Sequence, residues 1–561
     1  MEHKSKLLAT TSSEAQGACP ERTNDRFSSM PDEVAHRILS LLSILDLIRF
    51  GTVSKRCREL HLSTPSLNFD EFNNWNKSSY SKQFKLLNSL DRFLVLRRDS
   101  KIQQFRIRWS LAYGKGASLY NELYRVVTWI HMAVRCNVEV LDLELGIPET
   151  TELELPSCIF LCGSLRSLSV HCNKILTVPS SVHSTNLQYL KLTNVTIDEG
   201  FCKWISCSCK SIKELHLEHV RVENITIECS SLESFSFVFS SHSDLCHLSI
   251  SCEKLEAMRI NWRFDSPSSR SFKVFAPNLK YLKWTGSLLN NQNLGNFMCL
   301  ETAEIFLNHE ADNNDFGNVL ELLCSIRRVK VLLLSGETAK VLLREGSMPA
   351  LFDDISYLGV HMESLVDDMV STMVSLLRGM PNLKTLYVKC DPSFLIQKPK
   401  ACGFNREFWK SQNLAFIDHL KEATIELSSG NNGMELVRYM LEDAKNLKEM
   451  VILHSPEHST LFQVVNESKR KSAARVVFQE YKANEKRELG RSGSLDSVTL
   501  LEEIRRGYIS VTIELSNGFN AMELARYILE QAHRLEKTFI FYMIENESYI
   551  DERMDLAWTY N

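Results

Sequence analysis

Histidine and cysteine side chains are frequent enough in this chain to raise the question of catalysis or metal binding. The sequence holds 16 histidines and 16 cysteines, and Cys202, Cys207 and Cys209 form a close group. No C-x-x-C pair with the spacing of zinc ligands occurs, and the G-x-S-x-G, H-E-x-x-H and Walker-type motifs are absent. The sequence therefore predicts no catalytic residue, no metal ion and no other cofactor, with reduced cysteines in small core positions.

A set of polar side chains could bind a partner instead. Each flanks the last apolar residue of a short pattern of the form apolar-x-x-apolar-x-apolar, and points away from the core if that pattern is a strand. The set comprises Lys191, His216, Arg259, Lys283, Tyr387 and Lys389. The first four would form a mildly basic row, which could bind an acidic or phosphorylated segment of a target protein. The alternative is a solvated sheet face that binds nothing.

The apolar patterns recur along most of the chain. They run from Ile102-Gln-Gln-Phe105-Arg-Ile107 to Leu383-Lys-Thr-Leu386-Tyr-Val388. Most intervals are roughly twenty to thirty residues, which is the period of leucine-rich repeats. No repeat can bury its apolar face alone, so the strands are expected to stack in parallel as a solenoid, with irregular or helical returns on the convex side. The predicted repeat region covers residues 100–395.

Three short helices are predicted before the repeats, in residues 25–66. Pro31 suits the start of the first helix, where its missing N–H is not needed. Val34 and Ile38 begin an apolar stripe at helical spacing, and Asp46 and Ser54 are the expected caps of the second and third helices. The module holds more apolar residues than these stripes require. From pattern alone it is either a helical cap on a larger domain or a module that binds a partner.

The order of residues in this module resembles the F-box motif. The matching elements are Met30-Pro31-Asp32-Glu33-Val34, Ile38-Leu39, Leu42, Asp46-Leu47 and Val53-Ser54-Lys55-Arg56-Cys57-Arg58-Glu59-Leu60. The resemblance implies docking to a Skp-type adaptor and, through it, to the cullin of a ubiquitin ligase. The residues expected to contact the adaptor are Met30, Pro31, Val34, Ile38, Leu39, Leu42, Leu47, Val53, Ser54 and Cys57. Cys57 stands where many members have Trp, which predicts weaker docking because a large aromatic contact is lost.

The C-terminal third contains an internal duplication. The segment that starts at Ile425-Glu-Leu-Ser-Ser-Gly reappears without a gap at Ile513-Glu-Leu-Ser-Asn-Gly. Each copy predicts a strand, a turn, an amphipathic helix and a second, parallel strand. Residues 405–478, around the first copy, resemble the FBD domain that follows F-box and repeat regions in plant proteins. Residues 479–496 are charged and contain Gly and Ser, which predicts a linker, and residues 497–545 form a second FBD-like copy.

Composition sets the remaining expectations. At 561 residues the chain exceeds one ordinary compact domain, and its net charge of −4 gives no electrostatic reason to expect nucleic acid as a partner. No apolar run is long enough to span a membrane, so a cytoplasmic or nuclear protein is expected. Residues 1–24 are polar and without periodicity, which predicts a disordered tail, and residues 67–99 predict a helical connection.

Together these features predict an α/β chain with a short three-helix F-box, followed by an irregular leucine-rich-repeat solenoid that ends in FBD-like strand–helix–strand units. The resemblance implies a non-catalytic substrate-recognition subunit of an SCF-type ubiquitin ligase, which binds the adaptor through the F-box and a target protein through the repeats. Two alternatives remain open. One is a repeat scaffold with a degenerate F-box and no role in ubiquitination, and the other is an enzyme whose site is dispersed along the chain.

Overall fold

A computed structural model describes most of residues 30–480 and three short strands beyond them. Gaps lie at residues 70–79, 98–99, 111–116, 149–154, 180–184, 240–244, 264–269, 288–290, 296, 308–315, 344–351, 391–403, 428–431 and 455–471, of which 465 and 468 are described. The chain divides into two compact units, Met1–Gln479 and Glu480–Asn561, and each is described by itself. The predicted tail at residues 1–24 and residues 481–496 of the predicted linker lie outside the described residues. The first two residues of the predicted linker, 479–480, belong instead to a strand, Arg475–Glu480.

Three helices form the N-terminal module, α1 (Asp32–Leu39), α2 (Ile44–Phe50) and α3 (Lys55–Ser63). Ser54 caps α3 as predicted, because its Oγ accepts a hydrogen bond from the Cys57 N–H at 3.1 Å. The prediction that Asp46 caps α2 is wrong. That helix begins earlier in the chain, and its cap is Ser43, whose Oγ accepts the Asp46 N–H at 3.1 Å and donates to the Asp46 carboxylate at 2.8 Å. The inner faces of the three helices bury Ala35, Leu39, Ile44, Leu47 and Leu60.

The repeats form one long sheet of sixteen described strands, and β1 (Ser66–Phe69), directly after α3, is its first strand. The others, in spatial order, are β2 (Gln104–Ser110), β3 (Val140–Gly146), β4 (Ser167–Cys172), β6 (Tyr189–Thr193), β8 (Glu214–Glu218), β10 (Ser234–Phe239), β12 (Ala257–Trp262), β14 (Tyr281–Gly286), β16 (Thr302–Leu307), β17 (Val331–Ser335), β18 (Tyr357–Met362), β19 (Thr385–Cys390), β20 (Glu422–Glu426), β21 (Glu449–His454) and β22 (Arg475–Glu480). Neighbouring strands from β1 to β21 pair in parallel. The predicted parallel solenoid is therefore confirmed.

Hydrogen bonds at the start of each strand join one repeat to the next. The N–H groups of Lys280 and Tyr281 both donate to the carbonyl of Glu256, at 2.9 and 3.0 Å. Just before these residues, the side-chain amide of Asn278 donates to the carbonyl of Glu253 at 2.8 Å. Asn186, Asn382 and Asn446 make the same kind of bond to Gly163, Asp353 and Asp418. These contacts fix the spacing and register of the repeats, because each turn is tied to the backbone of the previous one.

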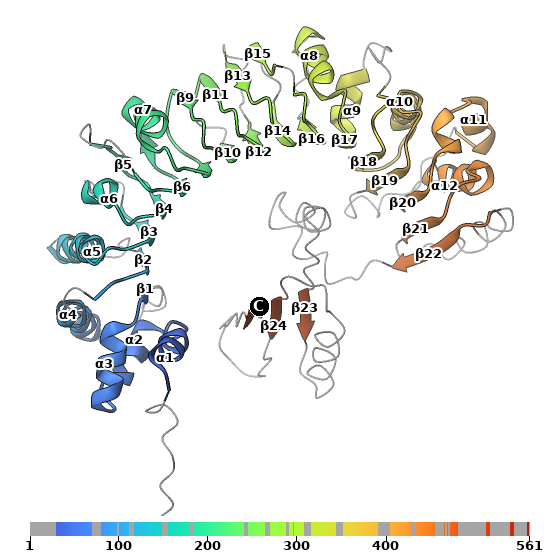
Figure 1. Cartoon of the computed structure of the whole chain (residues 1–561). Helices are drawn as coiled ribbons and strands as arrows, with labels where there is room; N and C mark the ends of the chain where they lie inside the picture. The colour runs from blue at the N-terminus through green and yellow to red at the C-terminus, as the bar shows by residue number, and fades with distance from the viewer. Residues whose placement is uncertain are drawn as a thin grey trace, which may run out of the picture. The chain divides into compact units, whose positions relative to one another are not determined.

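The returns between these strands lie along the outer side of the curved sheet (Figure 1). Helices make most of them: α4 (Tyr80–Leu96), α5 (Ala117–Arg135), α6 (Cys158–Leu161), α7 (Glu199–Ser208), α8 (Phe316–Ile326), α9 (Gly336–Leu343), α10 (Asp367–Arg378), α11 (Arg406–Ser411), η3 (Ala415–Asp418) and α12 (Asn432–Asp443). Among the described helices, none combines the length and apolar character needed to cross a bilayer.

The middle returns differ from the helical or irregular ones that were predicted. There β9 (Asn224–Glu228), β11 (His247–Ser251), β13 (Ser271–Phe275) and β15 (Asn291–Asn293) form a second, parallel sheet. Two shorter strands, β5 (Ile175–Leu176) and β7 (Thr196–Ile197), pair in the same way. Apolar and polar residues alternate in β9, β11 and β13, and this period of two favours a strand over a helix.

The duplication in the C-terminal third is visible in the pairing of its strands. In the first unit, β20, α12 and β21 follow one another as predicted, and Ile425 pairs with Ile452. In the second unit, β23 (Thr512–Leu515) pairs in parallel with β24 (Phe539–Tyr542), and Ile513 pairs with Ile540. These are corresponding residues of the two copies, so both copies use the same register. A short strand, β25 (Trp558–Thr559), pairs antiparallel with β24, and the helix predicted between β23 and β24 lies outside the described residues.

Candidate functional site

Helix α1 leaves an apolar face uncovered. Val34 and Ile38 are 47% and 40% exposed, and their spacing of four residues places them on one side of the helix. Leu41, in the turn just after α1, is 73% exposed. Pro31, at the N-cap of α1, is also exposed, and Val53, in the turn before α3, is 74% exposed. Exposed apolar side chains that gather on one face are typical of a docking surface.

Three of the predicted contact residues are buried. Leu39, Leu47 and Cys57 are only 1%, 2% and 8% exposed, because they pack into the interior of the helical module. They lie beneath the exposed face, and their contact with an adaptor stays a prediction. Cys57 therefore affects the packing inside the module, rather than removing an exposed aromatic contact. Of the remaining predicted residues, Met30 and Leu42 pack partly against the core and Ser54 caps α3.

One ion pair fixes the start of α1. The Arg56 guanidinium donates to the Asp32 carboxylate, and also to the backbone carbonyl of Met30 at 3.3 Å. The hydrogen bond from Arg56 lowers the pKa of Asp32, so the carboxylate stays charged well below neutral pH. Since Arg56 belongs to α3, these bonds tie the backbone on either side of Pro31 to a second helix.

The second candidate surface is the inner, concave face of the long sheet. Strand register places Lys191 beside His216, and Arg259 beside Lys283, with Ser236 between the two pairs. The predicted side-by-side arrangement therefore exists, and we refer to Lys191, His216, Arg259 and Lys283 as the basic row.

The charges of the basic row are largely compensated within the chain. Lys191 Nζ lies 3.0 Å from Glu218 Oε1, and Lys283 Nζ lies 3.4 Å from the buried Glu304 Oε2. Burial lowers the pKa of His216, so this imidazole is mostly uncharged at neutral pH.

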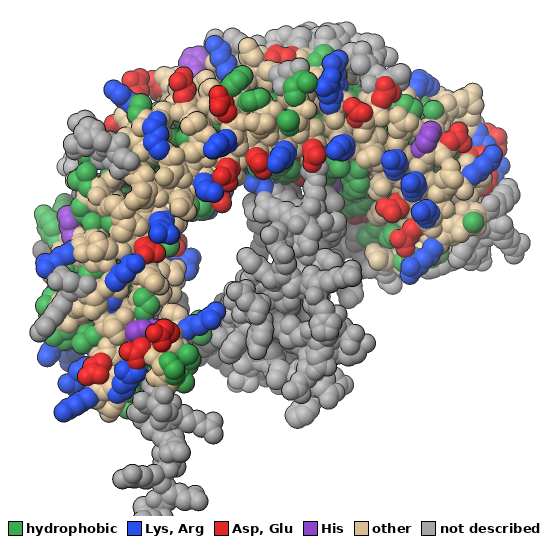
Figure 2. All heavy atoms as spheres, viewed as in Figure 1, with side chains coloured by type: hydrophobic (Ala, Val, Ile, Leu, Met, Phe, Trp, Pro, Cys, Tyr) green, Lys and Arg blue, Asp and Glu red, His purple; other side chains and the backbone are tan. Residues whose placement is uncertain are grey.

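The fourth member, Arg259, stacks over the ring of Tyr281 at 5.0 Å. Figure 2 shows basic and acidic side chains interspersed over the visible surface rather than separated into a positive band. The interpretation of the basic row as a site for an acidic segment therefore loses its electrostatic basis.

An aromatic cluster lies further along the same face. The His361 ring lies 5.4 Å from the Phe306 ring and 5.9 Å from the Tyr387 ring. Tyr387 donates its hydroxyl to Glu426 Oε1 at 2.9 Å, and burial, together with this carboxylate, raises the Tyr387 pKa. Burial, with the positive charges of Lys389 and Lys283, lowers the pKa of His361 to about 4. The predicted residues Tyr387 and Lys389 thus lie beside a buried, uncharged His361, with Tyr387 held by its hydrogen bond to Glu426.

Three described cysteines have thiols whose pKa is raised. Burial raises the pKa of Cys202, and raises that of Cys209 to about 12, so both thiols stay protonated. Cys158 Sγ lies 3.3 Å from His131 Nδ1, yet burial raises the Cys158 pKa as well. In the part of the chain that the structure describes, no three His, Cys, Asp or Glu side chains gather as metal ligands.

Comparison with known protein families gives two matches to family models. The F-box domain matches residues 27–60, and the repeats described as "FBD-associated F-box protein At5g56370, LRR repeats" match residues 126–309. The chain carries an F-box and leucine-rich repeats. The exposed face of α1 thus belongs to the F-box, and the basic row belongs to the leucine-rich repeats.

Curated relatives have the same organisation over most of their length. The F-box/LRR-repeat protein At4g14103 of Arabidopsis thaliana is 26% identical over 405 residues, which are 67% of this chain and 97% of the relative. The putative F-box/FBD/LRR-repeat protein At5g44950 of the same plant is 25% identical over 481 residues, which are 81% of this chain and 99% of the relative. The limits of the FBD domain at residues 405–478, and of the other predicted domains, stay predictions.

The sequence interpretation missed several residues of the repeat surface. His361 follows Val360, the last apolar residue of one repeat pattern, just as Lys389 follows Val388. The rule that selected Lys389 therefore also selects His361, and a consistent application would have found it. Glu304 and Glu426 also flank the last apolar residues, Ile305 and Ile425, of such patterns. The sequence gives no sign of their partners, because the hydroxyls of Tyr281 and Tyr387 that they accept belong to other strands.

Proposed function

We propose that the chain is the substrate-recognition subunit of an SCF-type ubiquitin ligase. The F-box binds a Skp-type adaptor and, through it, a cullin, while the repeats bind a target protein. The observation that carries the proposal is the uncovered apolar face of α1, with Val34 and Ile38 at 47% and 40% exposure within a matched F-box. The solenoid has its own core and does not use these side chains, so an outside partner explains them best.

The mechanism is proximity rather than chemistry by this chain. A bound target is held near a ubiquitin-conjugating enzyme that the ligase recruits, and this raises the effective concentration of the target lysines. The chain itself contributes no catalytic group, no metal and no cofactor. The proposal places the protein in the cytoplasm, the nucleus or both.

Binding of the purified full-length chain to a purified Skp-type adaptor tests the proposal. The variant Val34→Glu with Ile38→Glu places two charges on the exposed face of α1, and should weaken adaptor binding by about tenfold or more. The variant Tyr124→Glu is a matched control, because Tyr124 is 69% exposed on α5, outside the F-box. Both variants should keep the thermal unfolding midpoint of the parent chain, since neither changes a buried side chain.

Failure of the parent chain to bind the adaptor would contradict the proposal and favour the repeat scaffold. Equal weakening by Tyr124→Glu would also contradict it, because binding would then not depend on the F-box face. Leu39→Ala is unsuitable as a test, since Leu39 is 1% exposed and its loss would disturb the F-box core.

A further inference from the structure

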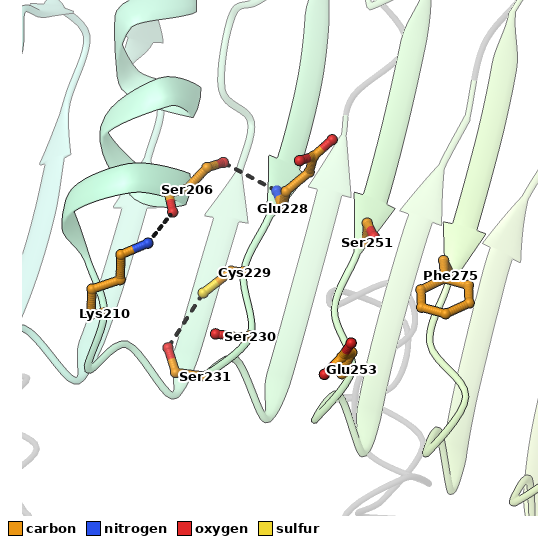
Figure 3. A pocket seen from close by; sticks show the side chains of 9 residues that line it. All are labelled: Ser206, Lys210, Glu228, Cys229, Ser230, Ser231, Ser251, Glu253 and Phe275. Atoms are coloured by element: carbon orange, nitrogen blue, oxygen red, sulfur yellow. Dashed lines mark hydrogen bonds between the residues drawn. The ribbon is translucent and has the colours of Figure 1, made fainter.

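A depression of about 290 Å³ lies where the outer strands β9, β11 and β13 end beside α7 (Figure 3). It is on the convex side of the repeats, so it is separate from both the F-box face and the concave face. Serine hydroxyls, carboxylates and one aromatic ring line it. This mixture of side chains makes the site distinct from the apolar core beneath it.

Strand register explains the shape of the depression. Glu228, Ser251 and Phe275 are paired neighbours on β9, β11 and β13. Because adjacent strands are about 4.8 Å apart, Glu228 and Phe275 stand roughly 10 Å from each other, with only the small Ser251 side chain between them. Phe275 is 57% exposed, so its ring forms one wall of an open groove whose opposite wall is Glu228.

The carboxylates at this groove are not neutralised by the chain. Glu253 lies past the end of β11 and joins Glu228 in lining the site. Within the described residues, no lysine or arginine forms an ion pair with either carboxylate. The one basic side chain in the lining is Lys210, whose Nζ donates to the Ser206 carbonyl at 3.2 Å.

The backbone of the groove is held in place from several directions. Ser206 Oγ accepts the Glu228 N–H at 3.1 Å, which anchors the end of β9 to α7. The Cys229 N–H donates to the Ser251 carbonyl at 3.1 Å, and the Cys252 N–H donates to the Phe275 carbonyl at 2.9 Å. Because this backbone is fixed before binding, only the side chains of the groove lose conformational freedom when a ligand enters.

We propose that this groove binds an arginine side chain from a partner protein. The planar guanidinium would lie over Ser251, with its face against the Phe275 ring and its N–H groups directed to Glu228 and Glu253. An acidic or phosphorylated side chain would be repelled by the same two carboxylates. The proposal does not depend on the ligase role, because no part of the F-box takes part in it.

Fluorescence anisotropy with the full-length chain tests this site. The probe is a fluorescein-labelled peptide, Gly-Ser-Gly-Arg-Gly-Ser-Gly amide, and its matched control carries citrulline, which has the same shape without the charge. We expect the arginine peptide to bind about fivefold more tightly than the citrulline peptide, and the difference to shrink as salt is added. The variants Phe275→Ala and Glu228→Gln should each weaken binding about threefold to fivefold.

Glu223→Gln is the matched control variant, since Glu223 is exposed just before the opposite end of β9 and its replacement changes the net charge equally. Binding to this variant should equal that of the parent chain. Three outcomes would overturn the proposal: no saturable binding up to about 1 mM peptide, equal binding of the citrulline peptide, or equal loss in Glu228→Gln and Glu223→Gln. The last outcome would mean that the peptide senses only the net charge of the chain.

Discussion

The exposed faces of the F-box and of the leucine-rich repeats differ in kind, because the first is apolar and the second carries paired charges. Helix α1 and the turn after it leave Val34, Ile38 and Leu41 uncovered, although these side chains would stabilise a larger core if they were buried. The concave face of the repeats instead pairs its charges, as Lys191 does with Glu218 and Lys283 with Glu304. One surface leaves apolar side chains uncovered, and the other pairs most of its charges within the chain.

This difference shows which kind of partner each region can recognise. An uncovered apolar face gains free energy from any complementary apolar surface, which suits an adaptor shared by many F-box proteins. A compensated polar face gains little from charge alone. It must discriminate by shape and by fixed aromatic rings, such as those of Phe306 and Tyr387 beside His361.

The contrast between the two regions would not hold if the exposed apolar side chains of the F-box contributed to the free energy of unfolding. The prediction with the largest expected effect tests this point. Phe237 is fully buried, and its ring lies 5.3 Å from Phe239 and 6.1 Å from Trp262. Phe237→Ala should lower the free energy of unfolding of the repeats by about 3–5 kcal/mol, because it removes packing contacts and leaves a cavity. Val53→Ala, at a side chain that is 74% exposed, should change it by less than about 0.5 kcal/mol.

Thermal and urea unfolding of the two variants measure this contrast. Phe275→Ala is the matched control within the repeats, because it removes the same side chain from a position that is 57% exposed. A loss of stability in Val53→Ala similar to that in Phe237→Ala would show that the F-box face is part of a core.

The burial of an uncharged histidine on the concave face predicts a pH dependence. His361 has a pKa of about 4 in the folded chain, against 6.5 for the free side chain, so the unfolded chain binds the proton first as pH falls. The stability from neutral His361 is therefore complete above about pH 6.5 and is lost between about pH 6.5 and 4. The loss amounts to at most about 3 kcal/mol.

Unfolding experiments between pH 4 and 7 check this prediction. His361→Gln should flatten the pH profile in that range, since glutamine does not titrate. His171→Gln, at an exposed position of β4 on the same face, controls for the loss of an imidazole. An unchanged profile in His361→Gln would show that His361 is accessible to protons in the folded chain.

Much of the fold could be predicted because one pattern of apolar residues recurs along most of the chain. The spacing of Leu187, Leu190 and Leu192 fixes one strand, and its repetition fixes the parallel sheet. The duplicated segment predicted a parallel strand pair, and Ile513 pairs with Ile540 as Ile425 pairs with Ile452.

The side-chain partners could not be predicted in the same way. Lys191 and Glu218 lie on neighbouring strands, and nothing in either pattern indicates that they meet diagonally across the register. The sequence also did not indicate which apolar residues of the F-box are buried. Ile38 and Leu39 are adjacent apolar residues of the same motif, yet one is 40% exposed and the other 1%.

The smallest expected effect tests how firmly the concave charges are paired. Lys191 and Glu218 retain 35% and 28% of their side-chain exposure, so water screens their attraction. A double-mutant cycle with Lys191→Ala and Glu218→Ala should give a coupling free energy below about 1 kcal/mol, which decreases further as salt is added.

Such a small coupling would mean that the pair cancels the local charge without holding the strands together. A partner could then separate Lys191 from Glu218 at low cost and contact either one. A coupling above about 2 kcal/mol, unaffected by salt, would instead assign the pair to the structure of the repeats. In that case, only the apolar and aromatic part of the concave face would remain open to a target protein.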